Sequence, residues 1–170
     1  MGMHEADIGL PSEWVVRWAS LIESGTVLDL ACGKGRHSRF FLERGLDVVA
    51  VDREPREIPG ARFVQADLED GGPWPLAGEQ FEGVVVTNYL HRPLFPHIVD
   101  ALAPGGVVIY ETFMVGNERY GGVSNPDFLL EPGELLSAFD ALEVLAFEET
   151  EVDSGKRRVV QRICARKRPG

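Results

Sequence analysis

The stretch VLDLACGKGRHS, residues 27–38, decides the fold of this chain. An apolar run interrupted by Asp29 breaks on Gly33 and Gly35, and a helical pattern follows. A buried strand, a glycine-rich turn and a helix in this order form the first unit of an open α/β sheet. Ligands of such sheets bind beyond the carboxyl ends of the strands, so the chemistry is expected there.

The rest of the chain alternates short apolar runs with amphipathic segments, which indicates a parallel sheet covered by helices on both faces. After residue 113 the alternation stops, and the last two runs, joined by the turn 153–156, predict an antiparallel hairpin. The pattern predicts strands over 26–32, 47–52, 62–67, 81–89, 107–113, 142–150 and 157–167, helices over 11–23, 36–45, 94–106 and 131–142, and a long loop over 114–130.

Composition fits one ordinary globular domain over residues 1–170, with 44% hydrophobic and 26% charged residues. The net charge of -10 argues against general binding of nucleic acid. No apolar run is long enough to span a membrane, and the first residues resemble no targeting signal, so a cytoplasmic protein without a membrane partner, monomeric or homodimeric, is expected. Cys32 and Cys164 are too few for a disulfide framework, and no metal-ligand spacing occurs.

The acid before the two glycines selects among ligands. A dinucleotide fingerprint needs a third glycine where Ser38 stands, and a pyrophosphate is disfavoured beside the carboxylate of Asp29. A ligand carrying an ammonium and a sulfonium is attracted to that carboxylate instead. S-adenosylmethionine is such a ligand.

Two further acids end the next two predicted strands. Asp52 can accept two hydrogen bonds from ribose hydroxyls, and Asp67 can accept one from an adenine amino group. Each alone is explained equally well as a cap or a turn residue. Together, at the ends of successive strands, they indicate a nucleoside site.

The chain resembles the class I S-adenosylmethionine-dependent methyltransferases over nearly all of residues 11–167. The resemblance rests on VLDLACGKGRHS, on the strand ends VAVDR and VQADL, and on the terminal helix, strand and strand. It implies a Rossmann-like three-layer sandwich with a seven-stranded, mostly parallel sheet, whose last strand is antiparallel and inserted between the fifth and sixth. Cys32 stands where the resemblance leads us to expect glycine. The cofactor-binding residues that the resemblance implies are Asp29, Ala31, Cys32, Gly33, Gly35, Arg36, Asp52, Arg53, Asp67, Leu68 and Asn88.

Shorter motifs narrow the resemblance. GKGRHS, ETF, GNERYGG and NPDFLLEPGELL are similar to stretches of the small bacterial tellurite-resistance-like methyltransferases. This likeness implies a small acceptor, either anionic or chalcogen-containing.

The segment TNYLHRP, residues 87–93, is expected beside the transferred methyl group. Tyr89, His91 and Arg92 are the candidate catalytic residues: His91 as a general base toward a hydroxyl acceptor, and Arg92 as a grip on an oxyanion. Both also have ordinary structural explanations, a local hydrogen bond for His91 and a surface ion pair for Arg92. The loop 114–130 is predicted to be a mobile lid, with Glu111, Tyr120 and Asn125 as polar contributors.

The sequence therefore predicts an enzyme that transfers a methyl group from S-adenosylmethionine to a small molecule with a thiol, chalcogen oxyanion or hydroxyl acceptor. Two alternatives stay open. One is a module that binds the cofactor without catalysis. The other is an NADP-dependent oxidoreductase in which Arg53 meets the 2′-phosphate, although the missing third glycine opposes it.

Overall fold

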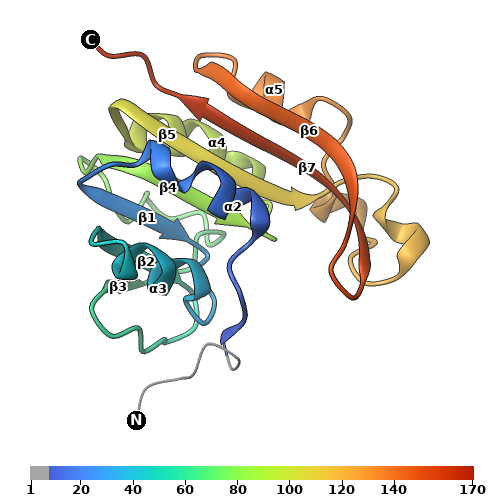
Figure 1. Cartoon of the computed structure of the whole chain (residues 1–170), viewed down its shortest axis with the longest axis horizontal. Coiled ribbons are helices and arrows are strands. Elements are labelled where there is room, and N and C mark those ends of the chain that lie inside the picture. The colour runs from blue at the N-terminus through green and yellow to red at the C-terminus, as the bar shows by residue number, and fades with distance from the viewer. Residues whose placement is uncertain (1–7) are drawn as a thin grey trace.

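A computed structural model describes residues 8–170, which form one seven-stranded sheet of order β3-β2-β1-β4-β5-β7-β6 (Figure 1). Neighbouring strands from β3 to β5 are parallel, and β7 is antiparallel to both of its neighbours. The strands are β1 (Thr26–Leu30), β2 (Asp47–Asp52), β3 (Arg62–Gln65), β4 (Phe81–Thr87), β5 (Leu102–Phe113), β6 (Glu143–Asp153) and β7 (Arg157–Arg166). The predicted fold class and the inserted antiparallel strand are confirmed.

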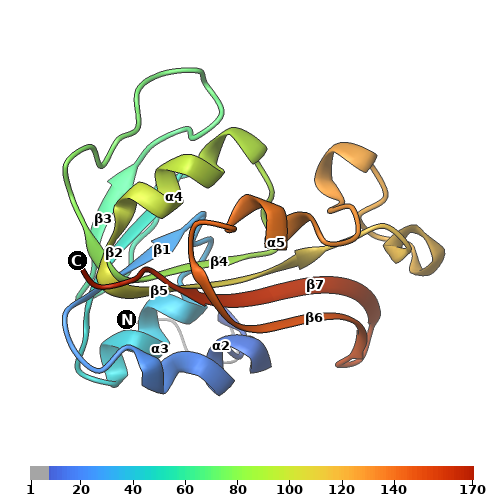
Figure 2. The same ribbon diagram turned by 90° about the horizontal axis from the view of Figure 1, so that it is seen from above.

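Helices cover both faces of the sheet (Figure 2). On one face lie α2 (Glu13–Trp18), its 3-10 extension Ala19–Leu21, and α3 (Arg36–Glu43); on the other lie α4 (Phe95–Ala101), after the 3-10 turn Arg92–Leu94, and α5 (Glu134–Ala138). Side chains alternate across each strand, so Leu28 and Leu30 pack in the core under α4 and α5, whereas Val27 packs in the core under α2 and α3. Odd-numbered positions of β1, Asp29 among them, therefore face α3.

Some predicted boundaries are wrong. The helix expected in the segment 94–106, with Pro104 and the two glycines as its end, stops at Ala101. Strand β5 begins at Leu102 and includes Pro104, Gly105 and Gly106, with a register shift between Phe81 and Gly83 of β4. Pro104 cannot continue a helix, so the chain turns extended before it.

The loop 114–130 contains two 3-10 turns, Asn117–Tyr120 and Pro126–Phe128, and Met114 bridges to Leu130. The Nδ2 atom of the buried Asn117 donates to the carbonyl of Val123 at 2.9 Å, and its Oδ1 accepts from the amide of Val159 at 2.9 Å. The loop is thus tied to the sheet and internally braced, which favours a fixed wall over the predicted mobile lid.

No helix among residues 8–170 is long and apolar enough to cross a membrane. The N-terminal residues used to argue against a targeting signal lie, up to residue 7, outside the described part of the chain.

Candidate functional site

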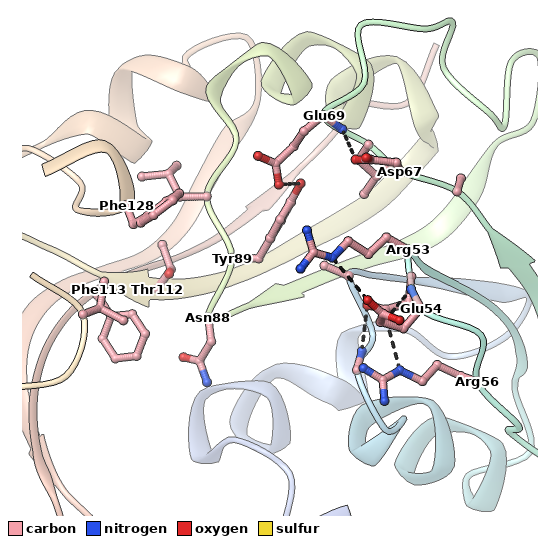
Figure 3. A pocket seen from close by; sticks show the side chains of 17 residues that line it. Arg53, Glu54, Arg56, Asp67, Glu69, Asn88, Tyr89, Thr112, Phe113 and Phe128 are labelled. Carbon is pink, nitrogen blue, oxygen red and sulfur yellow. Dashed lines mark hydrogen bonds and ion pairs between the residues drawn. The ribbon is translucent and has the colours of Figure 1, made fainter. Parts of the chain in front are cut away.

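A cavity of about 520 Å³ opens beyond the carboxyl ends of the five parallel strands (Figure 3). Its wall comes from the segments that follow β1, β2, β3 and β4, from the end of β5, and from the loop after β5. The lining residues are Ala31, Gly33, Asp52, Arg53, Glu54, Arg56, Ala66, Asp67, Leu68, Glu69, Asn88, Tyr89, Leu90, Thr112, Phe113, Val123 and Phe128. This is the place where an open α/β sheet binds its ligands.

Two lining residues, Ala31 and Asn88, hold a left-handed backbone with φ of 55°. Non-glycine residues rarely adopt this conformation, and it is concentrated at functional sites. The resemblance led us to expect glycine at position 32. The structure instead gives the left-handed backbone conformation to Ala31, and Cys32 does not adopt it. Cys32 is buried and its amide donates to the carbonyl of Val51 at 2.9 Å, which fastens it to β2 and away from the cavity.

Gly33 and Gly35 also have positive φ, but only Gly33 lines the cavity. A Cβ at Gly35 would stand 3.0 Å from the Ile58 side chain, so this glycine permits close packing rather than ligand contact. Arg36, at the start of α3, donates to the carbonyl of Leu10 at 3.0 Å and is not part of the cavity wall.

Asp29 lies beneath the loop instead of in the cavity. It is 3% exposed, and its Oδ2 accepts from the backbone amide of Ser38 at 3.0 Å and from the Ser38 hydroxyl at 2.7 Å. Burial raises the pKa of Asp29 to about 7, although the hydrogen bonds from Ser38 act in the opposite direction. The carboxyl group thus ties the first turn of α3 to β1 and orients the loop that carries Gly33.

Asp52 faces the cavity at the end of β2. Its Oδ1 accepts from the amide of Gly33 at 3.4 Å, and its Oδ2 accepts from the amide of Glu54 at 3.2 Å and from Arg56 Nε at 3.1 Å. These contacts hold the carboxylate between the loops that follow β1 and β2. Arg53, the next residue, is exposed and its Nε lies 3.7 Å from Glu54 Oε1.

Asp67 and Leu68 line the cavity just after β3. The Oδ1 of Asp67 accepts from the amide of Glu69 at 2.9 Å and shapes the turn. The hydroxyl of Tyr89 donates to Glu69 Oε2 at 3.1 Å across the cavity mouth. Burial, and then the nearby Glu69, raise the pKa of Tyr89, so its hydroxyl stays protonated.

Of the three candidate catalytic residues, only Tyr89 lines the cavity. The ring of His91 lies outside it, with Nδ1 3.7 Å from Glu69 Oε1. Arg92 points toward the loop after β5: it pairs with Glu134 at 2.6 Å and donates to the carbonyls of Asp127 and Leu129 at 3.1 and 2.9 Å. Its guanidinium braces the wall rather than facing a ligand.

The predicted polar contributors from the loop region lie elsewhere as well. Glu111 is buried and accepts from the Ser12 hydroxyl at 2.9 Å, and the Tyr120 hydroxyl donates to Glu151 at 2.8 Å. The Asn125 side chain accepts from the amide of Asp127 at 2.9 Å and caps a turn. None of the three lines the cavity.

Sequence analysis missed the far end of the cavity. Thr112, Phe113 and Phe128 line it there, on the side opposite Arg56 (Figure 3), and Val123 of the same loop as Phe128 also lines the cavity. The apolar residues of the loop after β5 were the available signal. The topology places that loop beside the ends of β4 and β5.

Residues 27–106 match the family model described as a methyltransferase domain. Among known proteins, the chain is 28% identical over 159 residues to a ribosomal RNA small subunit methyltransferase H of Gemmatimonas aurantiaca, covering 87% of this chain and 48% of that protein. It is 31% identical over 119 residues to a trans-aconitate 2-methyltransferase of Rhizobium leguminosarum bv. trifolii, covering 64% of this chain and 41% of that protein. The chain thus spans less than half the length of these relatives.

Solved structures share the fold. TehB from Haemophilus influenzae superposes with a TM-score of 0.75 at 18% identity, covering 93% of this chain and 63% of that one. The 1,6-didemethyltoxoflavin-N1-methyltransferase of Burkholderia thailandensis, solved with S-adenosylhomocysteine, gives a TM-score of 0.66 at 20% identity, covering 91% of this chain and 76% of that one. The predicted resemblance to class I methyltransferases is confirmed, and S-adenosylmethionine is the cofactor of that family.

Proposed function

We propose that this chain, whose residues 27–106 match a methyltransferase domain, transfers a methyl group from S-adenosylmethionine to a small-molecule acceptor. One observation carries the proposal. Asp52 and Asp67, at the carboxyl ends of neighbouring strands, line a single cavity whose other end is apolar. Such a cavity has a polar place for a nucleoside and an adjoining place for an acceptor.

The lining residues fit this cofactor in size and charge. A volume of about 520 Å³ is typical of sites that enclose a small molecule. Asp52, Glu54, Asp67 and Glu69 outnumber Arg53 and Arg56 along the wall, which suits a ligand with a sulfonium and an ammonium. The same excess of acids disfavours the phosphates of NADP.

Each proposed binding residue has a specific task. Asp52 accepts hydrogen bonds from the ribose hydroxyls, and Asp67 with the backbone of Leu68 contacts the adenine. Ala31, Gly33 and Asn88 form the backbone wall beside the methionine part, where two left-handed residues shape the surface. Asp29 acts from below by holding the Gly33 loop in place.

When bound, the cofactor supplies an already activated leaving group, and the protein has to orient the acceptor and exclude water. The acceptor nucleophile, a thiol, hydroxyl or chalcogen oxyanion, forms a bond to the methyl carbon as the carbon–sulfur bond breaks. A protonated acceptor also loses one proton. Among residues 8–170 no histidine lines the cavity, and Tyr89 stays protonated, so neither group is the base; we propose that the proton passes to solvent.

Incubation with S-adenosylmethionine carrying a deuterated methyl group tests the proposal by mass spectrometry. A panel of small thiols, phenols, selenite and tellurite supplies the acceptors. We expect S-adenosylhomocysteine and a labelled product to appear in equal amounts. Tight binding of the cofactor without turnover by any acceptor would favour a sensor module instead.

A further inference from the structure

The far end of the cavity differs chemically from the rest. Thr112, Phe113, Val123 and Phe128 meet there, together with Leu90 of the segment after β4. None of these residues carries a charge. The acceptor end is defined here by these five residues, and its surface is largely apolar.

Phe128 is 48% exposed although its ring lies against the cavity. Exposing so much of a phenyl ring costs free energy that an apolar ligand recovers by covering it. Thr112 shows the complementary feature: the residue is 1% exposed, and its hydroxyl has no hydrogen-bond partner among residues 8–170. A cavity ligand is therefore offered one polar contact within an apolar surround.

Three arginines near the cavity are engaged by other partners. Arg56 pairs with Asp52 at 3.1 Å at the opposite end of the cavity, and Arg53, 3.7 Å from Glu54, extends its guanidinium toward Tyr89 (Figure 3). The charge of Arg92 is neutralised by Glu134, and its guanidinium also donates hydrogen bonds to the carbonyls of Asp127 and Leu129. None of the five residues of the acceptor end supplies a positive charge, so burying an anionic acceptor against them is costly.

We propose that the natural acceptor is an uncharged, mainly apolar small molecule that bears one nucleophilic group, seated in the acceptor end. The inference rests on the proposed function and narrows its substrate class. The narrower resemblance to tellurite-resistance-like enzymes implied an anionic or chalcogen-containing acceptor, and the acceptor end opposes the anionic form. With a thiol, the sulfur bonds to the methyl carbon, the cofactor leaves as its neutral thioether, and the thiol proton goes to water.

A matched pair of acceptors tests charge alone. Benzyl mercaptan and 4-(mercaptomethyl)benzoate share the nucleophile and differ by one carboxylate. We expect kcat/KM to be at least about tenfold higher for benzyl mercaptan, because none of the five residues of the acceptor end is a cation that could pair with the carboxylate. Selenite and trans-aconitate should be poorer still.

Substitutions test whether the discrimination between the two thiols arises at the acceptor end. Val123→Lys adds a cation there and should narrow the ratio between the two thiols, whereas Val144→Lys, at an exposed position on β6, should not. Phe128→Ala should raise KM for benzyl mercaptan roughly five- to thirtyfold through lost apolar contact, and Leu136→Ala, exposed on α5, should leave it unchanged.

Binding of S-adenosylhomocysteine, measured on the same samples, separates the two proposals. If the nucleoside binds but the carboxylate thiol or trans-aconitate reacts best, the acceptor inference is wrong and the proposed function stands. If no nucleoside binds, the proposed function itself fails. Equal ratios in Val123→Lys and the parent chain would also overturn the inference.

Discussion

The two ends of the cavity are built differently. At the cofactor end, Asp52 ends β2 opposite Gln65 of the parallel strand β3, Asp67 follows two residues later, and each acid is held by hydrogen bonds within its own turn. At the acceptor end, Val123 and Phe128 come from a loop outside the sheet, which is held by the contacts of Arg92 and Asn117, by the bridge from Met114 to Leu130 and by the hydrogen bond from Tyr120 to Glu151. The parallel strands of the sheet can therefore hold the cofactor, while the loop after β5 determines which acceptor fits.

Replacing Asp52 with alanine should have the largest effect of these substitutions, and the effect should be on cofactor binding. Loss of the ribose hydrogen bonds should weaken binding of S-adenosylhomocysteine by roughly 2 to 4 kcal/mol. Titration calorimetry measures this directly. Asp47→Ala, at the exposed start of the same strand, is the control, and equal affinities in the two variants would remove Asp52 from the site.

Asp29 tests how the loop under the cofactor end is held. Because its folded pKa, about 7, lies above its ordinary value, folding favours the neutral form, and this contribution to stability is lost as pH rises from about 4 to 7. Asp29→Asn should abolish that loss, on the order of 3 kcal/mol. Denaturant unfolding of both proteins at pH 4, 5, 6 and 7 measures it, and parallel stability curves would contradict the assignment.

Arg92→Ala should affect the acceptor end alone. Removing the brace leaves Glu134 and two carbonyls without their donor, so the free energy of unfolding should fall by about 1 to 2 kcal/mol and KM for the acceptor should rise. Affinity for S-adenosylhomocysteine should not change. Arg62→Ala breaks an exposed pair with Glu79 and should do neither. If KM rose for anionic acceptors alone, Arg92 would bind the acceptor directly, as the sequence predicted.

The smallest effect is expected from Tyr89→Phe. Among residues 8–170 the hydroxyl donates to the exposed Glu69, and it stays protonated. The activation free energy calculated from kcat/KM should therefore change by less than about 1 kcal/mol. Steady-state kinetics over pH 6 to 9 provides the measurement. A drop in kcat of a hundredfold or more would show that Tyr89 takes part in the chemistry.

The sheet could be predicted because each strand carries its own signal. Apolar runs such as 47–52 and turn glycines are local features, and the alternation of strands with helices limits the topology to a few choices. Asp52 and Asp67 could be predicted for the same reason, since the end of a strand is visible in the sequence. The end of α4 was predicted too late in the chain because β5 begins at Leu102, which pairs with Phe81 of β4.

The acceptor end could not be predicted in the same way. Whether Arg92 faces a ligand or Glu134 depends on where α5 packs, 42 residues away. The side on which Asp29 points follows from strand alternation, but its burial under α3 depends on the whole layer. Phe113 and Phe128 were visible as apolar loop residues, yet only the fold brings them to one wall.

Titration of the intact chain with S-adenosylhomocysteine and, separately, with NADP⁺ tests the central claim most directly. The account predicts binding of one S-adenosylhomocysteine per chain, and weaker or no binding of NADP⁺, because four acids, Asp52 and Asp67 among them, line the cavity. Tighter binding of NADP⁺, or no binding of S-adenosylhomocysteine, would contradict it.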